Sequence, residues 1–218
     1  MKSVKRAVVL LSGGLDSATA LYFAKAKGYK CHCLVFDYGQ LHKKEIIFAQ
    51  KVAKASGSSS EILKINLPWK GSALLDKKIK VPQKPVSGIP STYVPGRNII
   101  FLSFALSFAE TLKADAIFIG VHAQDYSGYP DCRPEFFRAF VKMARVGTYG
   151  AKNIKILAPL LGKKKSQIIK LGQKLGVPFE LTWSCYRGKG MPCGACDSCH
   201  YRELGFKEAK IKDPLLKI

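Results

Sequence analysis

Short apolar runs recur along the chain, and a segment with helical periodicity follows most of them. The first run, residues 7–11, is continuously apolar, which is typical of a strand buried on both faces of a parallel sheet. This alternation predicts an α/β fold with a doubly wound, Rossmann-like, five-stranded parallel sheet. We expect residues 1–180 to form this α/β domain and residues 181–218 to form a small C-terminal segment. The other four strands are expected at residues 30–36, 61–66, 116–121 and 154–160.

Helices are expected between these strands. Residues 16–27 and 42–56 have the apolar or amphipathic pattern of helices that cover a sheet. Residues 99–109 are almost entirely apolar, so this helix is predicted to be buried, with Asn98 as its N-cap. Residues 67–97 lose the periodicity, and a loop of this length is usually functional or mobile.

The turn between the first strand and the first helix carries the strongest chemical signal. Residues 12–17 read Ser-Gly-Gly-Leu-Asp-Ser. Glycine lets the backbone approach a ligand closely, and the unpaired N–H groups at a helix N-terminus attract anions. Neither the Walker pattern G-x-x-x-x-G-K-[ST] nor the dinucleotide fingerprint G-x-G-x-x-G occurs in the chain. The alternative is an ordinary strand-to-helix turn that carries two glycines.

The pattern S-G-G-x-D-S after an apolar strand resembles the pyrophosphate loop of the N-type ATP pyrophosphatases. Those enzymes use ATP to adenylate a carbonyl or carboxylate oxygen. AMP is then the leaving group for a nitrogen or sulfur nucleophile. The resemblance implies that residues 12–17 bind the phosphates of ATP.

Polar side chains also follow the later strands, at the sheet edge where open α/β folds bind ligands. Gln40, His42 and Glu45 follow the second strand, and they either face the nucleotide cleft or form a solvated helix start. Arg97 precedes the apolar helix and either holds a phosphate or carboxylate or makes a surface ion pair. Lys165 follows the fifth strand, from which a lysine can reach a triphosphate.

The loop after the fourth strand is where a substrate loop belongs. Asp125 and Asp131 can accept hydrogen bonds from the N–H edge of a base. Tyr126 and Phe136 offer stacking surfaces. The sequence therefore predicts that a heterocyclic substrate binds here.

The net charge of +21 raises nucleic acid as a possible partner. The lysines are nevertheless scattered along the whole chain, and a lysine-rich composition together with attraction for ATP accounts for most of the charge. Nucleic acid is therefore the less favoured partner. The apolar runs are too short and too interrupted for a signal peptide or a membrane span, so we expect a cytoplasmic protein without a membrane partner.

Four of the seven cysteines fall within fifteen residues near the C-terminus. Their spacing, with two overlapping C-x2-C pairs, fits a tetrahedral zinc ion in a closed and therefore structural site. An iron–sulfur cluster and a redox dithiol are the alternatives. Cys31 and Cys33 share one face of a strand and either bind metal or pack in the core. The expected zinc ligands are Cys185, Cys193, Cys196 and Cys199.

Five segments in this order resemble the 7-cyano-7-deazaguanine synthase family of queuosine biosynthesis. The resemblance covers essentially the whole chain and implies the adenine nucleotide alpha hydrolase type of Rossmann-like fold. It implies a carbon–nitrogen ligase that uses ATP and Mg²⁺ to adenylate 7-carboxy-7-deazaguanine. Ammonia then gives the amide, and a second activation dehydrates the amide to the nitrile, preQ0. The segments are residues 12–17, 37–40, 93–98 and 126–136 and the four cysteines.

The same resemblance implies roles for individual residues, and it suggests a homodimer. Asp16, Ser17 and Lys165 would act in catalysis, with Asp16 helping to hold Mg²⁺. The ATP-binding set would be Leu10, Leu11, Ser12, Gly13, Gly14, Leu15, Asp16, Ser17, Ala18 and Phe36. The deazaguanine would face Arg97, Asp125, Tyr126, Asp131 and Phe136. The four C-terminal cysteines would bind Zn²⁺.

Two other classes of protein remain open. One is a member of the same superfamily that thiolates or lysidinylates tRNA, for which Cys31, Cys33 and Cys132 are the available thiols. Such enzymes usually carry an additional RNA-binding domain, for which this chain has no room. The other is a nucleotide-binding module without catalysis, which the polar substrate loops disfavour.

Overall fold

The computed structural model describes residues 4–83, 88–125, 128–150, 152–188 and 190–217. Five parallel strands form one sheet in the order β3-β2-β1-β4-β5. The predicted doubly wound, five-stranded parallel sheet is confirmed. The strands are β1 (Arg6–Leu10), β2 (Lys30–Asp37), β3 (Ser59–Lys64), β4 (Ala116–Phe118) and β5 (Lys155–Leu157).

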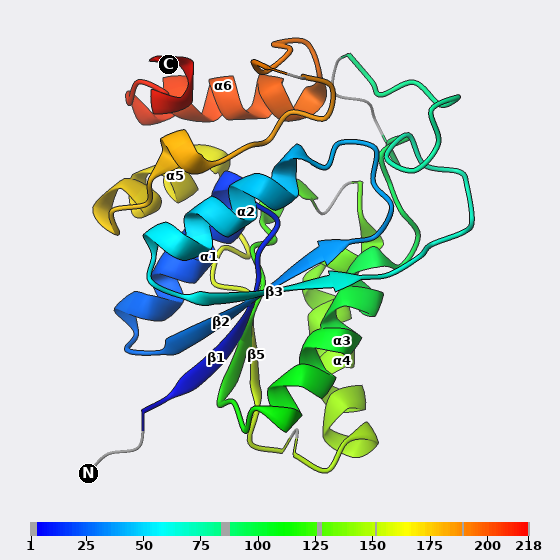
Figure 1. Ribbon diagram of the computed structural model, residues 1–218, viewed down its shortest axis with the longest axis vertical. Helices are drawn as coiled ribbons and strands as arrows, with labels where there is room; N and C mark the ends of the chain where they lie inside the picture. The colour runs from blue at the N-terminus through cyan, green and yellow to red at the C-terminus, as the bar shows by residue number, and fades with distance from the viewer. Residues whose placement is uncertain (1–3, 84–87, 126–127, 151, 189, 218) are drawn as a thin grey trace.

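Helices cover both faces of the sheet (Figure 1). Successive side chains of β1 alternate between two cores, with Ala7 and Val9 in one and Val8 and Leu10 in the other. The continuous apolar run of β1 is therefore explained by burial on both faces. The first core holds α1 (Leu15–Ala26), α2 (Lys44–Ala55) and α5 (Lys165–Lys174), and the second holds α3 (Arg97–Thr111) and α4 (Pro134–Gly147).

Strand β4 ends earlier than its apolar run. Residues 119–121 continue that run, yet the strand stops at Phe118. At Gly120 the chain passes so close to the start of α1 that an added Cβ would lie 2.7 Å from the backbone nitrogen of Ser17. The backbone N–H of Ile119 still donates to the carbonyl of Leu157 at 3.0 Å, and the chain leaves the sheet at the close approach to α1.

Helix α3 is only partly buried, so the prediction that it is wholly buried is wrong. Its inner face, which includes Leu102 and Leu106, packs against the sheet. Ile99 and Phe104 on its outer side are 46% and 41% exposed. The apolar pattern around this helix does not distinguish the two sides, because both carry large apolar residues.

The start of α3 is capped by a residue distant in sequence. The backbone N–H of Asn98 donates to the Asp131 carboxylate at 2.8 Å. The helix begins at Arg97, so Asn98 lies inside the first turn and is not the predicted N-cap. Asp131 supplies the acceptor that the free N–H groups of a helix start require.

Helix α6 (Asp197–Ala209) lies on α5 at one end of the molecule (Figure 1). Phe206 and Ala209 of α6 belong to the same core as α1 and α5. The boundary at residue 180 stays a prediction. None of the helices in the described ranges combines the length and apolar content needed to cross a bilayer.

Replacing Arg202 with methionine is expected to lower the free energy of unfolding by about 3–5 kcal/mol, the cost of leaving a buried charge unpaired. Arg202 and Asp213 have side chains only 5% and 6% exposed, joined by hydrogen bonds of 2.6 and 2.8 Å. Arg202 also donates to the Thr182 hydroxyl at 2.9 Å. Urea denaturation measures the change, with exposed Arg138→Met on α4 as the matched control. A loss below about 1 kcal/mol, the range of a surface ion pair, would contradict this prediction.

Candidate active site

Residues 12–17, which the sequence predicts to bind phosphate and which are called the phosphate loop below, lie at the carboxyl end of β1 and run into α1. The Ser17 hydroxyl donates to the carbonyl of Gly14 at 3.0 Å and accepts from the backbone N–H of Ser12 at 3.1 Å. Gly13 has φ +81°, and a Cβ there would collide with the backbone of Glu45 in α2. The loop is therefore preformed and requires glycine at this point.

Asp16, at the start of α1, faces a lysine from the start of α5. The Lys165 ammonium lies 2.9 and 2.8 Å from the two carboxylate oxygens of Asp16. It also lies 2.8 Å from Nε2 of His122. Burial alone would raise the pKa of the Asp16 carboxyl, but the Lys165 and His122 charges lower it below its usual value. Segments 149 residues apart thus meet in one charged cluster over the phosphate loop.

Arg97 lies at the start of α3 among tyrosine side chains. Its guanidinium donates to the Tyr38 hydroxyl at 3.2 Å and lies 5.8 Å from the centre of that ring. Burial opposes its charge, but Tyr38, Tyr186 and Tyr129 together raise its pKa. Burial also raises the pKa of Tyr38 to about 12, so this phenol keeps its proton at neutral pH. Within the described ranges no carboxylate lies within salt-bridge distance of Arg97, so the predicted surface ion pair is absent there.

Three adjoining cavities meet around Asp16 and Tyr186, which line all three. The first lies under α6, the second beside α2, and the third beside the start of α3. The predicted ATP-binding residues are distributed among them, apart from Gly13 and Ala18, which line none of the three. Leu15 lines the first cavity, Ser12, Gly14 and Phe36 line the second, and Leu10, Leu11, Ser12 and Ser17 line the third.

The predicted substrate residues do not all come together. Arg97 lines the second and third cavities, and Asp125 lines the first and third. Asp131 is 5% exposed and engaged with the start of α3, and burial raises the pKa of its carboxyl. Phe136 packs against the rings of α4 and lines none of the three cavities. Tyr126 lies outside the described residues.

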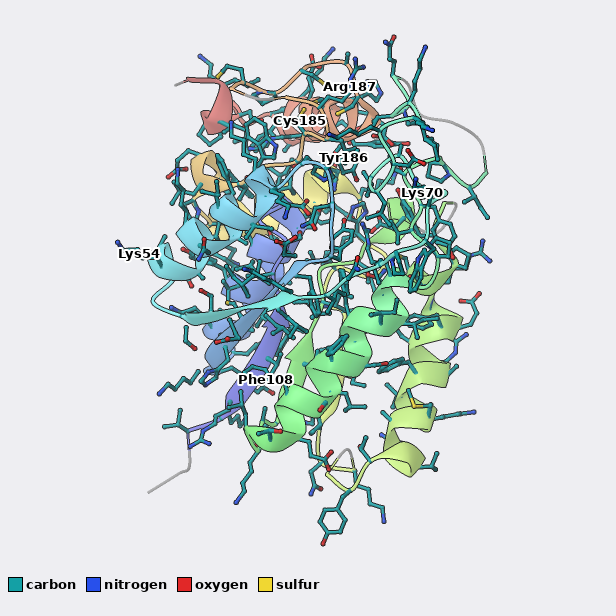
Figure 2. All side chains as sticks on the ribbon, turned by 45° about the vertical axis from the view of Figure 1, so that its right-hand side comes forward. Lys54, Lys70, Phe108, Cys185, Tyr186 and Arg187 are labelled. Atoms are coloured by element: carbon teal, nitrogen blue, oxygen red, sulfur yellow. The ribbon has the colours of Figure 1, made fainter. Side chains whose placement is uncertain are left out.

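Several cavity residues are missing from the sequence prediction. His122 directly follows the apolar run of β4, and this position in the sequence could have indicated that it lies at the ligand-binding edge of the sheet. Tyr186 lies next to Cys185 at the end of the molecule that α6 occupies, as Figure 2 shows. Nothing in the sequence places Tyr186 beside the phosphate loop, because the C-terminal chain reaches it only through the tertiary fold. A hydrogen bond joins the C-terminal chain to the phosphate loop directly, since the backbone N–H of Trp183 donates to the carbonyl of Gly13 at 2.8 Å.

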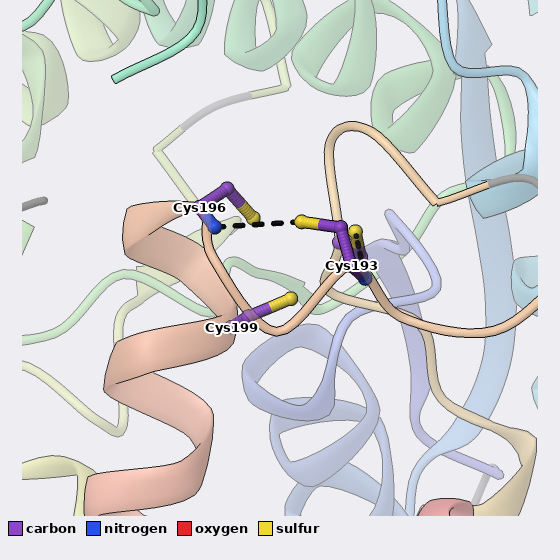
Figure 3. Close-up of side chains that lie close together, drawn as sticks. Cys193, Cys196 and Cys199 are labelled. Carbon is purple, nitrogen blue, oxygen red and sulfur yellow. Dashed lines mark hydrogen bonds between the residues drawn. The ribbon is translucent and has the colours of Figure 1, made fainter. Parts of the chain in front are cut away.

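The four C-terminal cysteines form a cluster that could hold a metal ion. Their sulfur atoms lie within 4.8 Å of one another, near the start of α6 (Figure 3). The Cys185 sulfur accepts hydrogen bonds from the backbone N–H groups of Gly188 at 3.0 Å and Cys193 at 3.2 Å. Hydrogen bonds from Cys196 and Cys199 lower the pKa of the Cys185 thiol. Four sulfurs at this spacing suit a tetrahedral ion with bonds of about 2.3 Å.

The other cysteines lie apart from this cluster. Cys31 and Cys33 belong to the core beneath α1 and α2. Burial raises their thiol pKa values to about 11 and about 12, respectively. Burial also raises the pKa of the Cys132 thiol, although this residue lines the third cavity. The core interpretation of Cys31 and Cys33 is therefore the better one.

The chain is similar over almost its whole length to proteins of one kind. The model of a family described as "Queuosine biosynthesis protein QueC" matches residues 6–210. The chain is 51% identical to a 7-cyano-7-deazaguanine synthase of Nostoc punctiforme, with 97% of this chain and 99% of that protein covered. It is 54% identical to a 7-cyano-7-deazaguanine synthase of Clostridium kluyveri, with 97% of each covered.

Solved structures show the same fold at low sequence identity. An NMN synthetase from Francisella tularensis is 17% identical, with a TM-score of 0.52 over 97% of this chain and 79% of that chain. A 4-thiouridine synthetase in complex with RNA and ATP is also 17% identical, with a TM-score of 0.51 over 94% of this chain and 50% of that chain. At this identity the likeness shows the fold alone.

Proposed function

The chain belongs to the family of 7-cyano-7-deazaguanine synthases in queuosine biosynthesis, and we propose that its three adjoining cavities perform an ATP-dependent version of that reaction. ATP adenylates the carboxylate of 7-carboxy-7-deazaguanine, and ammonia displaces AMP to form the amide. A second ATP activates the amide oxygen, and loss of that oxygen gives the nitrile. Activation is required because a carboxylate is a poor electrophile and its oxygen is a poor leaving group.

The partly buried Arg97 is the observation that carries this proposal. Its guanidinium is hydrogen-bonded to Tyr38, and no carboxylate of the described residues lies within salt-bridge distance of it. A partly buried cation at the wall of a cavity favours an anionic substrate group, and a guanidinium can bind a carboxylate through two parallel hydrogen bonds. We assign the substrate carboxylate to Arg97, next to the phosphate loop that lines the same cavities.

The phosphate loop and Lys165 act on ATP. The N–H groups of residues 12–17 and the start of α1 bind the phosphates, and Phe36 forms part of the wall for the adenine. The Lys165 ammonium stabilises the charge that develops on the departing pyrophosphate. Asp16, which is 24% exposed, and Asp125, which is 26% exposed, offer the oxygen ligands that Mg²⁺ prefers. When bound, that ion would neutralise phosphate charge.

We propose zinc as the metal of the four-cysteine site, in a structural role. The cluster supplies four thiolates and no open position, which is the arrangement of structural zinc. The first and second cavities include Ser184, Tyr186 and Ser198 from the chain around the cluster. Elemental analysis of purified protein tests the identity of the metal. Iron at the same stoichiometry would replace zinc in this assignment.

We also propose a homodimer. Ile99 and Phe104 on α3 and Met143 and Val146 on α4 are large apolar side chains with substantial exposure. Helices α3 and α4 lie side by side on one face of the sheet (Figure 1). A second copy covering this face would remove apolar surface from water. Light scattering coupled to size-exclusion chromatography gives the molecular mass in solution. A monomer at micromolar concentration would refute the proposal.

Mass spectrometry of the reaction products tests the proposed function. We expect protein supplied with ATP, Mg²⁺, ammonium and 7-carboxy-7-deazaguanine to form the nitrile, and the amount of AMP should rise together with the amount of nitrile. Omission of ammonium should stop amide and nitrile formation. Folded, metal-loaded protein that yields no product under these conditions would refute the proposal.

A further inference from the structure

His42 and Glu45 form a polar pair on the wall of the second cavity, outside the predicted catalytic set. Nε2 of His42 lies 3.3 Å from Oε2 of Glu45. The other carboxylate oxygen, Oε1, accepts from the Gln40 amide at 3.0 Å. Gln40 is 1% exposed, and its own amide is fixed by the backbone of Phe36 and Tyr38. The carboxylate is therefore held in place, with Oε2 directed to the histidine side.

The His42 ring is unusual in its surroundings. Its side chain is only 9% exposed, and its ring lies edge to face on Tyr186 with centroids 5.2 Å apart. Nε2 is buried and makes no hydrogen bond within the described part of the chain. Nε2 lies close to Glu45 without hydrogen-bonding to it; a buried polar atom without a hydrogen bond is costly, and such an atom in a functional cavity points to a ligand.

The position of this pair relates it to the reacting groups. The same cavity is lined by Ser12 and Gly14 of the phosphate loop and by Arg97. The backbone of Glu45 lies directly against Gly13, so the first turn of α2 touches the phosphate loop. A small ligand in the cavity beside His42 and Glu45 would therefore adjoin the place where the acyl adenylate forms.

The nucleophile of the reaction poses two requirements. Amines are protonated in neutral water, as the pKa of about 10.4 for the lysine amine illustrates. The species available is thus ammonium, a small cation without a lone pair for attack. A site for it needs a negative charge to attract the cation and a base to remove one proton.

We propose that Glu45 and His42 form an ammonium-binding site, in which Glu45 binds the cation and Nε2 of His42 takes its proton. Ammonium binds beside the pair, whose 3.3 Å separation widens as the ion donates one hydrogen bond to Oε2 of Glu45 and one to Nε2 of His42. The proton in the hydrogen bond to His42 is then transferred to the imidazole, which leaves ammonia with a free lone pair. The inference rests on the proposed function, because it supplies that reaction with its nucleophile.

Amide formation makes one C–N bond and breaks one C–O bond. The ammonia lone pair forms a C–N bond to the carbonyl carbon of the acyl adenylate. The C–O bond to AMP breaks, and AMP leaves with that electron pair. The new amide nitrogen then loses one more proton to water, and the imidazolium of His42 releases its proton before the next cycle.

Glu45→Gln is expected to raise the KM for ammonium at least about tenfold, the effect of losing one charge-assisted hydrogen bond. The KM for ATP should stay within twofold. His42→Gln should lower kcat with ammonium about 10²-fold or more, the usual contribution of a general base. Initial rates of AMP and amide formation at varied ammonium chloride measure both effects. The matched control is Glu61→Gln, which removes an exposed carboxylate on β3.

Hydroxylamine separates this role from a structural one. It is largely unprotonated at neutral pH, so it needs neither a cation site nor a base. Both variants should form the hydroxamate from the acyl adenylate at nearly the wild-type rate, which also proves that they fold and bind ATP. Equal losses with ammonium and hydroxylamine, or wild-type ammonium kinetics in both variants, would overturn the ammonium site. Wild-type protein that forms neither hydroxamate nor amide would overturn the proposed function and this site with it.

Discussion

Replacing Lys165 with glutamine is expected to lower kcat about 10²–10³-fold, the usual effect of removing one preorganised electrostatic group from an active site. The Lys165 ammonium is 10% exposed and holds both oxygens of Asp16 within 2.9 Å. Its charge is thus already oriented toward the phosphate loop before ATP binds. Pyrophosphate release measured under saturating substrates reports the change in kcat.

Loss of stability is a separate effect of the same substitution. Without the lysine, the partly exposed Asp16 carboxylate loses its main counter-charge, so the melting temperature should fall as well. The double variant Lys165→Gln with Asp16→Asn should recover much of the stability but none of the activity. Lys170→Gln, an exposed lysine of the same helix, is the matched control. Activity within threefold of wild type in Lys165→Gln would contradict the assigned role.

Replacing Cys196 with serine is expected to release the metal and unfold the C-terminal segment. Structural zinc sites contribute about 10–16 kcal/mol of binding free energy, which is also folding free energy. The effect should reach the active site, because Trp183 is hydrogen-bonded to Gly13 and Tyr186 lines all three cavities. We expect metal content near zero, a large drop in melting temperature and no measurable ATP turnover.

Chelation and a control cysteine test the same prediction. A strong chelator should reproduce the loss in wild-type protein, and added zinc should restore it. Cys31→Ala removes a buried thiol that lies in the sheet core, outside the cluster, so it should retain full metal content. A metal-free Cys196→Ser protein with wild-type melting temperature and activity would show that the cluster is not structural.

The strands and the phosphate loop could be predicted because their signals are local. The run of residues 7–11 is apolar at every position, and strand geometry alone assigns successive side chains to opposite faces of the sheet. The hydrogen bonds of Ser17 to Ser12 and Gly14 are local, whereas the contact of Gly13 with Glu45 is a tertiary one. The spacing of the four cysteines is similarly local, except for Cys185, which lies eight residues before the next ligand.

The orientation of α3 and its cap could not be predicted from the sequence. Large apolar residues of α3 lie on both its inner and its outer side, so its composition does not identify the face that meets the sheet. The acceptor for its first turn comes from Asp131, 33 residues away. A cap provided by a distant loop leaves no signal next to the helix, and the sequence therefore favoured Asn98 instead.

The sequence by itself determined the parallel α/β fold, the phosphate loop, the metal cluster and the resemblance to one enzyme family, because each depends on periodicity or on short spacings. Only the tertiary structure decided which side chains share a cavity. Lys165 meets Asp16 across 149 residues, and Tyr186 reaches His42 because the C-terminal segment folds back over the sheet edge. Contacts between residues so far apart in the sequence depend on how whole helices pack. The order of residues along the chain does not specify which side chains meet until the core has formed.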